Sequence, residues 1–263
     1  MKRFGLIGHP IAHSLSPALF KAGYDGAYPY ELIETADFEE AYGRFLESYD
    51  GINVTAPFKE LAFAKADILS EECKAIGATN LLVKTTEGVK AYNSDFLGVR
   101  MWLSAVADEL KSAALPLRQP KACIAGLGGA GKAAAAAAES LGMEVIRLNR
   151  TIKDDRTLPL EDFREWFRKS DIIIYNIPTA IPQLDELTVE DFRGEDTTCR
   201  PKFILEANYK NPSFDNGLIM KMKEANPLAE YTSGKTWLLY QALTGYELFT
   251  GEKPDLDKMS DVL

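Results

Sequence analysis

The sequence is poor in cysteine and histidine. Its 263 residues include three cysteines, Cys73, Cys123 and Cys199, and two histidines, His9 and His13. Scattered cysteines without a Cys-x-x-Cys pair argue against a disulfide framework and a zinc site. Two histidines are also too few for a histidine-rich metal centre. We therefore expect no bound metal, and reduced thiols as in a cytoplasmic protein.

The chain also lacks an excess of basic charge and any long apolar run. Its 30 basic and 39 acidic residues give a formal net charge of -9, which argues against a nucleic-acid partner. No segment approaches the roughly 18 apolar residues of a membrane span, and the apolar run after Arg3 is too short for a signal peptide. We expect a cytoplasmic protein with a small-molecule partner. Whether it is a monomer or a homodimer stays open.

Strands and helices alternate along two stretches of the chain, which predicts an α/β fold with parallel sheets covered on both faces. The first stretch predicts strands over 4–7, 29–33 and 51–55, a helix over 18–23 opened by Ser16 as its cap, an amphipathic helix over 37–49 with Phe38, Tyr42, Phe45 and Leu46 on one face, and a hairpin over 80–92. The second predicts helices over 96–111, 130–141 and 237–249 and strands over 121–125, 144–148, 171–175 and 202–205.

A glycine-rich turn, Gly126-Leu127-Gly128-Gly129-Ala130-Gly131, follows one of these strands and opens a helix. Glycine allows a tight turn and lets backbone N–H groups approach a pyrophosphate, and the helix N-terminus favours that anion. Although G-x-G-x-x-G alone also occurs in ordinary loops, its place between strand and helix indicates a dinucleotide site of the Rossmann type.

The next strand indicates which dinucleotide binds. An NAD site has an acidic residue about 20 positions after the turn, whereas this strand ends in Asn149-Arg150-Thr151, followed by Lys153 and Arg156. A guanidinium there suits the 2′-phosphate of NADP, because its paired donors match phosphate oxygens. The alternative is a solvated basic loop. The pattern favours NADP as the cofactor.

Small polar residues, prolines and glycines gather at predicted strand ends in the first stretch, where α/β sheets bind ligands. These segments and several later ones resemble the shikimate dehydrogenase family, and their order and spacing hold across essentially the whole chain. The matching segments are His13-Ser14-Leu15-Ser16-Pro17, Asn53 to Lys59, Gly77 to Asn80, Asn93 to Gly98 (Asn-Ser-Asp, where the family usually has Asn-Thr-Asp), the glycine-rich turn, Asn149-Arg150-Thr151, Gln241-Ala242 and Thr250-Gly251.

The resemblance implies a catalytic pair, Lys59 and Asp95. Lys59 would pass a proton while a hydride moves between the substrate and the nicotinamide, and Asp95 would orient it. The chemistry agrees, because oxidising a secondary alcohol requires a base near the hydroxyl and the reverse reaction requires the same group as an acid. The implied reaction is the NADP-dependent, reversible reduction of 3-dehydroshikimate to shikimate, a step of aromatic amino acid and chorismate biosynthesis.

The resemblance also implies binding roles and a domain plan. Residues 1–97, joined by 234–263, would form an open α/β substrate domain, and 98–233 a Rossmann NADP domain, with a cleft between them. Substrate would be bound by Ser14, Ser16, Thr55, Lys59, Asn80, Asp95, Tyr209 and Gln241. Cofactor would be bound by Gly126, Gly128, Gly129, Ala130, Asn149, Arg150, Thr151, Lys153 and Gly234.

Several segments depart from the family pattern. Ile177 and Pro178 alter a segment near the cofactor, Trp237 replaces a methionine that usually faces the nicotinamide region, and Asp154 stands where a second arginine is common. Glu206 and Asn208 alter the segment around Tyr209. These departures affect the cofactor end more than the substrate end.

Two other functions stay open. A quinate/shikimate dehydrogenase using NAD or NADP would share the same motifs, although serine at both Ser14 and Ser16 favours shikimate. A ligand-binding homologue without turnover is the other alternative, and the intact Lys59 and Asp95 argue against it.

Overall fold

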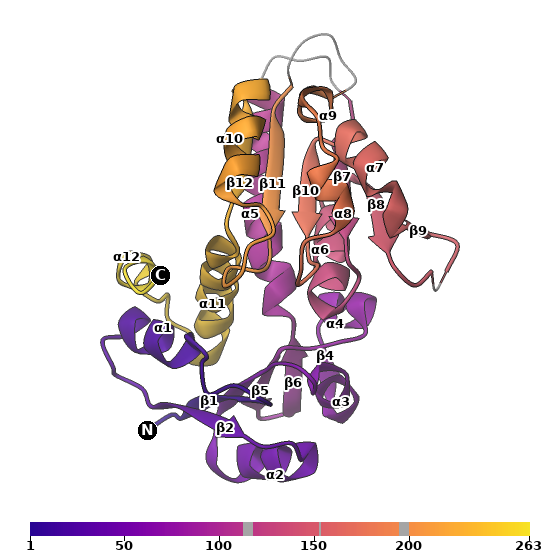
Figure 1. Ribbon diagram of the computed structural model, residues 1–263. Helices are drawn as coiled ribbons and strands as arrows, with labels where there is room; N and C mark the ends of the chain where they lie inside the picture. The colour runs from indigo at the N-terminus through magenta and orange to yellow at the C-terminus, as the bar shows by residue number, and fades with distance from the viewer. Residues whose placement is uncertain (113–117, 153, 195–199) are drawn as a thin grey trace. The chain divides into compact units, whose positions relative to one another are not determined.

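The computed structural model describes residues 1–112, 118–152, 154–194 and 200–263. This part of the chain divides into two compact units, Met1–Gly98 with Leu238–Leu263, and Val99–Trp237. Each unit is an α/β structure built on one six-stranded sheet (Figure 1). Among the helices of these described ranges, none is long and apolar enough to cross a membrane.

The first unit contains a mixed sheet in the order β2-β1-β3-β5-β6-β4. Its strands are β1 (Phe4–Gly8), β2 (Tyr30–Glu34), β3 (Gly51–Val54), β4 (Ile68–Leu69), β5 (Leu81–Thr85) and β6 (Gly88–Tyr92). Its helices are α1 (Ser16–Gly23), α2 (Phe38–Ser48), α3 (Lys59–Lys65), α4 (Glu71–Ile76) and α12 (Leu256–Ser260), with the start of α5 (Ser94–Ser112) and most of α11 (Gly234–Thr250). The antiparallel β5–β6 pair is the predicted hairpin.

Helices cover both faces of this sheet, as the sequence predicts. One face packs Ile7 and Val54 against Phe38 and Phe45 of α2. The opposite face packs Phe4 and other residues of the sheet against α1, α11 and α12. Leu46 was expected on the buried face of α2 but is 44% exposed. That prediction is wrong, because the buried stripe of α2 runs through Phe38, Ala41, Tyr42 and Phe45.

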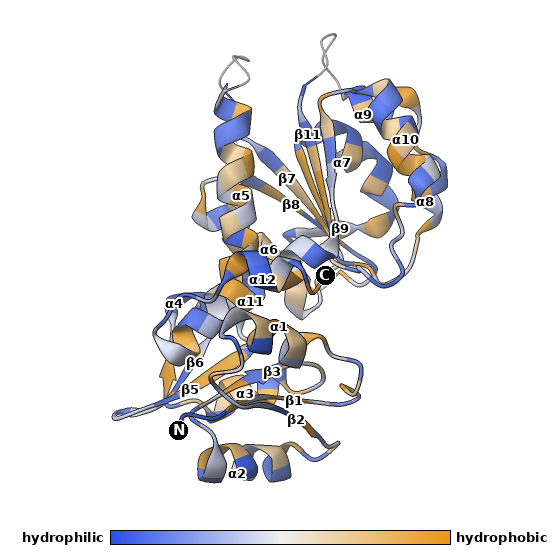
Figure 2. Ribbon diagram, turned by 90° about the vertical axis from the view of Figure 1, so that its left-hand side faces the viewer, coloured by the Kyte–Doolittle hydropathy of each residue, from blue (hydrophilic) through white to orange (hydrophobic). Residues whose placement is uncertain are grey.

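The second unit contains an all-parallel sheet in the order β12-β11-β10-β7-β8-β9. Its strands are β7 (Lys121–Ala125), β8 (Glu144–Asn149), β9 (Thr157–Pro159), β10 (Ile172–Tyr175), β11 (Lys202–Glu206) and β12 (Ala229–Thr232). Its helical segments are most of α5, the start of α11, α6 (Gly129–Ser140), η1 (Leu160–Asp162), α7 (Phe163–Lys169), α8 (Pro182–Asp185), α9 (Val189–Arg193) and α10 (Asn216–Ala225). Figure 2 shows the inner strands of this sheet as mainly hydrophobic, as expected for a parallel sheet covered on both faces.

Aromatic side chains from several elements form one side of the core of this second unit. Phe163, Phe167, Phe192 and Tyr175 are fully buried there, and burying each one contributes about 2 kcal/mol to folding. On helix α6 the buried positions are instead mostly alanine, which lets the helix lie close to the sheet. Such close packing brings the start of α6 against the end of β7, where the glycine-rich turn lies.

Candidate active site

Lys59 and Asp95 form an ion pair in the first unit. Lys59 is the first residue of α3 and Asp95 the second of α5, and Lys59 Nζ lies 2.5 Å from Asp95 Oδ2. Both side chains are mostly buried, with 23% and 13% of their surface exposed. The first turn of α5 is a favourable place for a carboxylate, because the helix dipole is positive there. The structure therefore brings this predicted pair into direct contact.

A hydrogen-bonded group lies next to this pair, and Ser94 is at its centre. Ser94 N donates to Asn80 Oδ1 at 2.7 Å, and Ser94 Oγ lies 3.0 Å from Gln241 Oε1. Gln241 Nε2 donates to the carbonyl of Leu238. Two predicted substrate residues, Asn80 and Gln241, are thus joined through a fully buried serine. In the sequence, Ser94 stands out only because the family usually has threonine there, and no role was predicted for it.

The same group continues through two tyrosines, the half-buried Tyr30 and the buried Tyr246. Tyr30 Oη donates to Asn53 Oδ1 at 2.7 Å, and Asn53 Nδ2 donates to the Asn80 carbonyl at 3.4 Å. Tyr246 Oη donates to the Ser16 carbonyl at 3.1 Å, and its ring lies 5.9 Å from that of Tyr30. Burial raises the pKa of both phenols, so they remain hydrogen-bond donors at neutral pH.

Ser14 and Ser16 lie together, but Ser16 is not the helix cap that the sequence predicts. Ser16 is the first residue of α1, and the cap position is Leu15, which makes no side-chain capping bond. The Oγ atoms of Ser14 and Ser16 lie 3.2 Å apart, and the Ser16 N–H donates to Ser14 Oγ. The two hydroxyl oxygens thus lie next to each other, and the Ser16 hydroxyl does not cap the helix.

Thr55 and the Lys59–Asp95 pair lie at one edge of the first sheet. Thr55 follows β3, and its N–H donates to Ile7 O on the neighbouring strand β1. Its carbonyl accepts from Phe58 N, one residue before Lys59. The β3–β5–β6 register places Asn80 and Asn93 at this same edge. The carboxyl edge of β1, β3 and β6 therefore carries most of the predicted substrate residues.

The glycine-rich turn has the geometry that its sequence predicts. Gly126 has φ +88°, which favours glycine, and a Cβ on Gly131 would clash with the carbonyl of Gly126. At Gly128, by contrast, a Cβ would meet open space. Gly128 caps helix α6, which begins with Gly129 and Ala130, so N–H groups of the first helical turn, which have no partner within the helix, follow directly after this open position.

The basic residues that follow β8 in the sequence have different surroundings in the structure. Asn149 Oδ1 accepts from Leu127 N of the turn, and Asn149 Nδ2 donates to Thr151 O. Arg150 is exposed, and no carboxylate of the described chain lies within 4 Å of its guanidinium. Arg156 instead pairs with Glu139 at 2.5 Å. Lys153 lies outside the described residues.

The remaining predicted residues, Tyr209 and Gly234, follow the ends of β11 and β12. Gly234 begins α11, and a side chain there would clash with the carbonyl of Ala207. Tyr209 is half-buried in the loop after β11. That loop is held by Glu206, which is fully buried and accepts from Ser213 N, Phe214 N and the Tyr231 hydroxyl. The departure at Glu206 thus has a structural role.

The residues of the second unit fit a dinucleotide. The open position at Gly128 leaves room for a pyrophosphate beside the helix N-terminus. Asn176, whose backbone lies against Gly126, has a buried Oδ1 without a hydrogen-bond partner among the described residues. Arg150 supplies an exposed guanidinium beyond the next strand. In the same described ranges, no group of three or more His, Cys, Asp or Glu side chains could hold a metal ion.

An all-parallel sheet with this turn, together with a second α/β unit that carries a lysine–carboxylate pair, defines a two-domain dehydrogenase of the Rossmann type. Residues 79–183 match the model of the D-isomer specific 2-hydroxyacid dehydrogenase NAD binding domain, which agrees with this class. Residues 6–82 match the shikimate dehydrogenase substrate binding domain.

Similar proteins identify the family. The chain is 32% identical to a shikimate dehydrogenase (NADP(+)) of Thermus thermophilus, over 99% of this chain and 97% of the relative. It is 31% identical to the Methanosarcina acetivorans protein of the same name, over 98% and 96%. The chain belongs to the shikimate dehydrogenase family.

Solved structures of similar fold agree with this family assignment. The T. thermophilus shikimate 5-dehydrogenase in complex with NADP(H) and shikimate has a TM-score of 0.75, with 29% identity and 100% and 98% of the two chains covered. A quinate dehydrogenase from Corynebacterium glutamicum in complex with NAD, at 18% identity and a TM-score of 0.74, shares the fold.

Proposed function

We propose that this chain catalyses the reversible, NADP-dependent reduction of 3-dehydroshikimate to shikimate, a step of aromatic amino acid and chorismate biosynthesis. The observation that carries the proposal is the contact between Lys59 and Asp95, which lie 36 residues apart and meet at the carboxyl edge of the first sheet. Two relatives that are 31–32% identical to this chain, and that it covers over 96–97% of their length, are named shikimate dehydrogenase (NADP(+)).

In this proposal Lys59 holds and moves the proton. During reduction the Lys59 ammonium donates a proton to the oxygen that becomes the substrate hydroxyl, and during oxidation the neutral amine takes it back. Asp95 accepts a hydrogen bond from Lys59 and so fixes the direction of its Nζ. When bound, the nicotinamide supplies or accepts the hydride. Because both side chains are mostly buried, little water competes for the proton.

The surrounding polar side chains orient the substrate. Ser14 and Ser16 donate their hydroxyl hydrogens to the substrate carboxylate, and Thr55, Asn80 and Gln241 bond its ring hydroxyls. Ser94 and Asn53 hold Asn80 in place, so its amide is directed before substrate arrives. Tyr209 helps to close the site. Such fixed polar groups select a substrate with matching hydroxyls, because an analogue lacking one leaves a buried group unpaired.

The second unit binds the cofactor. The turn from Gly126 to Ala130 accommodates the pyrophosphate, Asn149 shapes the turn, and Gly234 leaves space near Ala207. Arg150, with Thr151 and Lys153, binds the 2′-phosphate. The domain plan proposed from the sequence thus assigns substrate to the first unit and NADP to the second.

The protein acts on a small molecule in the cytoplasm, as a monomer or a homodimer. Burial raises the pKa of the Cys73 thiol to about 11 and of the Cys123 thiol to about 12, so neither forms a reactive thiolate at neutral pH. Such unpaired thiols suit a reducing compartment.

The test is a steady-state assay that follows the nicotinamide absorbance with each pairing of shikimate or quinate and NADP or NAD. We expect the highest kcat/KM with shikimate and NADP. Preference for quinate would favour the quinate/shikimate alternative, and absence of turnover with every pair would support a binding protein instead.

A further inference from the structure

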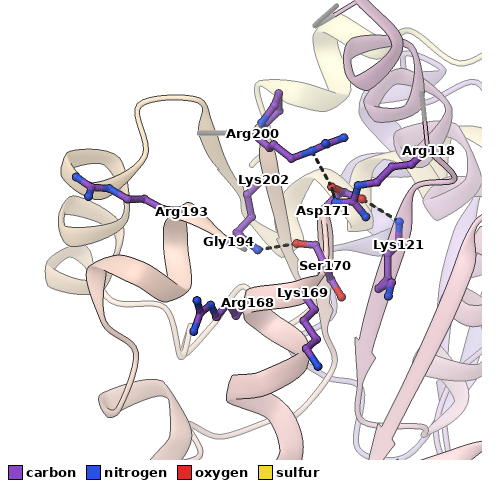
Figure 3. Close-up of a pocket in the computed structure, with 11 residues that line it drawn as sticks. Arg118, Lys121, Arg168, Lys169, Ser170, Asp171, Arg193, Gly194, Arg200 and Lys202 are labelled. Atoms are coloured by element: carbon purple, nitrogen blue, oxygen red, sulfur yellow. Dashed lines mark hydrogen bonds and ion pairs between the residues drawn. The ribbon is translucent and has the colours of Figure 1, made fainter. Parts of the chain in front are cut away.

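A cavity of about 240 Å³ lies at the amino edge of the second sheet, the edge opposite the glycine-rich turn. It lies where β7, β10 and β11 begin, and it includes Lys121, Asp171 and Lys202 at or beside these strand starts (Figure 3). Strand β7 runs five residues from Lys121 to Ala125, so about 15 Å separates this cavity from the turn. The cavity is therefore distinct from the proposed cofactor site.

The lining of this cavity is strongly basic, although the whole chain has a net charge of -9. Four arginines line it, Arg118, Arg168, Arg193 and Arg200. Three lysines join them, Lys121, Lys169 and Lys202, and among the described lining residues Asp171 alone carries a carboxylate. A cavity with one dominant sign of charge concentrates ions of the opposite sign, even on a protein of the same overall sign as those ions.

Asp171 does not balance this charge. Its carboxylate already accepts from Arg118 Nη2 at 2.6 Å and from the Lys121 backbone N–H at 3.0 Å, and lies 3.8 Å from Arg200 Nε. Arg168 and Arg193 have no carboxylate within 4 Å in the part of the chain that the structure describes. Arg193 Nε donates to the Ala225 carbonyl at 3.1 Å, so the Arg168 guanidinium and the Nη atoms of Arg193 remain for an anion after these internal pairs are made.

Lys202 shows how incomplete this internal balance is. It is 3% exposed, and its Nζ donates to the carbonyls of Phe167 and Ser170, both at 2.6 Å. Burial lowers the pKa of Lys202 to about 8, although Asp171 opposes the shift. A bound anion near Lys202 would add to the effect of Asp171 and favour the ammonium form.

Ser170 provides an independent sign of a ligand. Ser170 is one of the lining residues, it is 3% exposed, and its buried Oγ has no hydrogen-bond partner among the described residues. Buried hydroxyls are normally satisfied, so an unpaired one beside a basic cavity is consistent with a ligand atom that completes it. A hydroxyl can donate to an anionic oxygen, and the surrounding arginines can do the same.

We propose that this cavity binds a small phosphorylated metabolite through its phosphoryl group. Arginine guanidinium groups present paired donors that match phosphate oxygens, and the Ser170 hydroxyl adds a single donor. The cavity volume limits the ligand to a small molecule, and the net charge of -9 argues against an extended polyanion such as a nucleic acid. This site goes beyond the proposed dehydrogenase activity and does not depend on it.

The test is isothermal titration calorimetry of the full chain with inorganic phosphate and glycerol 3-phosphate, with succinate as a dicarboxylate, at constant ionic strength. We expect one saturable site for both phosphoryl probes and at least tenfold weaker binding of succinate. Combining Arg168→Gln with Arg193→Gln should weaken phosphate binding at least tenfold. Arg168→Gln alone changes an exposed side chain and should weaken it severalfold, which keeps the test valid should the double variant unfold.

Two matched controls locate the site. Arg44→Gln removes an exposed arginine of the first unit, and Arg150→Gln removes the arginine proposed for the 2′-phosphate of NADP. Neither should change phosphate affinity by more than twofold. Loss of binding in Arg150→Gln but not in the cavity variants would overturn the proposal, as would equal binding of succinate or no saturable phosphate binding. Shikimate turnover of the cavity variants in the absence of phosphate should match wild type, so failure here leaves the proposed function intact.

Ser170→Ala separates a ligand-binding role from a structural one. Because the Oγ has no partner in the described chain, its removal should leave the melting temperature unchanged or slightly higher. Phosphate affinity should fall severalfold. A lower melting temperature with unchanged phosphate affinity would show that the hydroxyl serves the fold, and would contradict its place in the site.

Discussion

At the carboxyl edge of the first sheet, the predicted site side chains are paired with one another, whereas at that of the second sheet the glycine-rich turn exposes backbone without large side chains. Lys59 and Asp95 are in contact, and Asn80, Ser94 and Gln241 form one hydrogen-bonded group. In the second unit the glycine-rich turn offers N–H groups. Fixed side chains suit chemistry and substrate selection, and open backbone suits a large anionic cofactor.

The comparison predicts that changes at the first edge act on turnover. Lys59→Ala should lower kcat for shikimate oxidation by about 10²- to 10⁴-fold, because it removes the proton-transfer group. Lys65→Ala is a matched control on the same helix, since Lys65 pairs with Glu39 at the surface. It should keep wild-type kcat. The comparison fails if Lys59→Ala retains kcat, or if both variants lose it equally.

Changes in the glycine-rich turn should divide into structural and binding effects. Gly131→Ala places a Cβ against the Gly126 carbonyl and should lower the free energy of unfolding by about 3 kcal/mol. Gly128→Ala meets open space and should change that free energy by less than about 0.5 kcal/mol. It should nevertheless raise KM for NADP. Denaturant unfolding and kinetics together check this pair, and equal destabilisation by both changes would contradict the geometry.

Arg150 tests whether the second edge selects NADP. Arg150→Ala should raise KM for NADP about tenfold, the loss expected for one charge-assisted hydrogen-bonded contact, and leave KM for NAD nearly unchanged. Arg156→Ala is the control, because Arg156 pairs with Glu139. It should affect neither KM. A similar rise for both cofactors in Arg150→Ala would argue against the 2′-phosphate contact.

The smallest expected effect concerns Ser94, which holds the predicted substrate side chains Asn80 and Gln241 in place. Ser94→Ala should cost about 1 kcal/mol of folding free energy and raise KM for shikimate a few fold, with a smaller change in kcat. Ser94→Thr retains the hydroxyl and should restore KM. Kinetics of the two variants check this, and no difference between them would show that the hydroxyl does not position Asn80 or Gln241.

Local patterns predicted much of the molecule. Alternating strands and helices gave the α/β class, and β7, from Lys121 to Ala125, lies where it was expected. Two local predictions were wrong because they depend on packing or on a nearby side chain. Leu46 is exposed because α2 packs on the sheet through Phe38, Ala41, Tyr42 and Phe45. Ser16 bonds with Ser14 instead of capping α1.

Long-range contacts could be predicted only where a motif marked them. The Lys59–Asp95 pair was expected because both residues lie in segments that resemble a family. The role of Ser94 was not, because its partners Asn80 and Gln241 come from distant segments. The basic cavity around Ser170 could not be predicted from the sequence either. Its lining comes from several separate segments that meet only at the start of the strands.

The claim that Lys59 and Asp95 act as one unit is tested most directly by a double-mutant cycle. kcat for shikimate oxidation with NADP would be measured for wild type, Lys59→Ala, Asp95→Ala and the double variant. Residues that act together are strongly non-additive, so the double variant should lose little more kcat than Lys59→Ala alone. A loss equal to the product of the two single losses would show that the residues act independently, and would contradict the account.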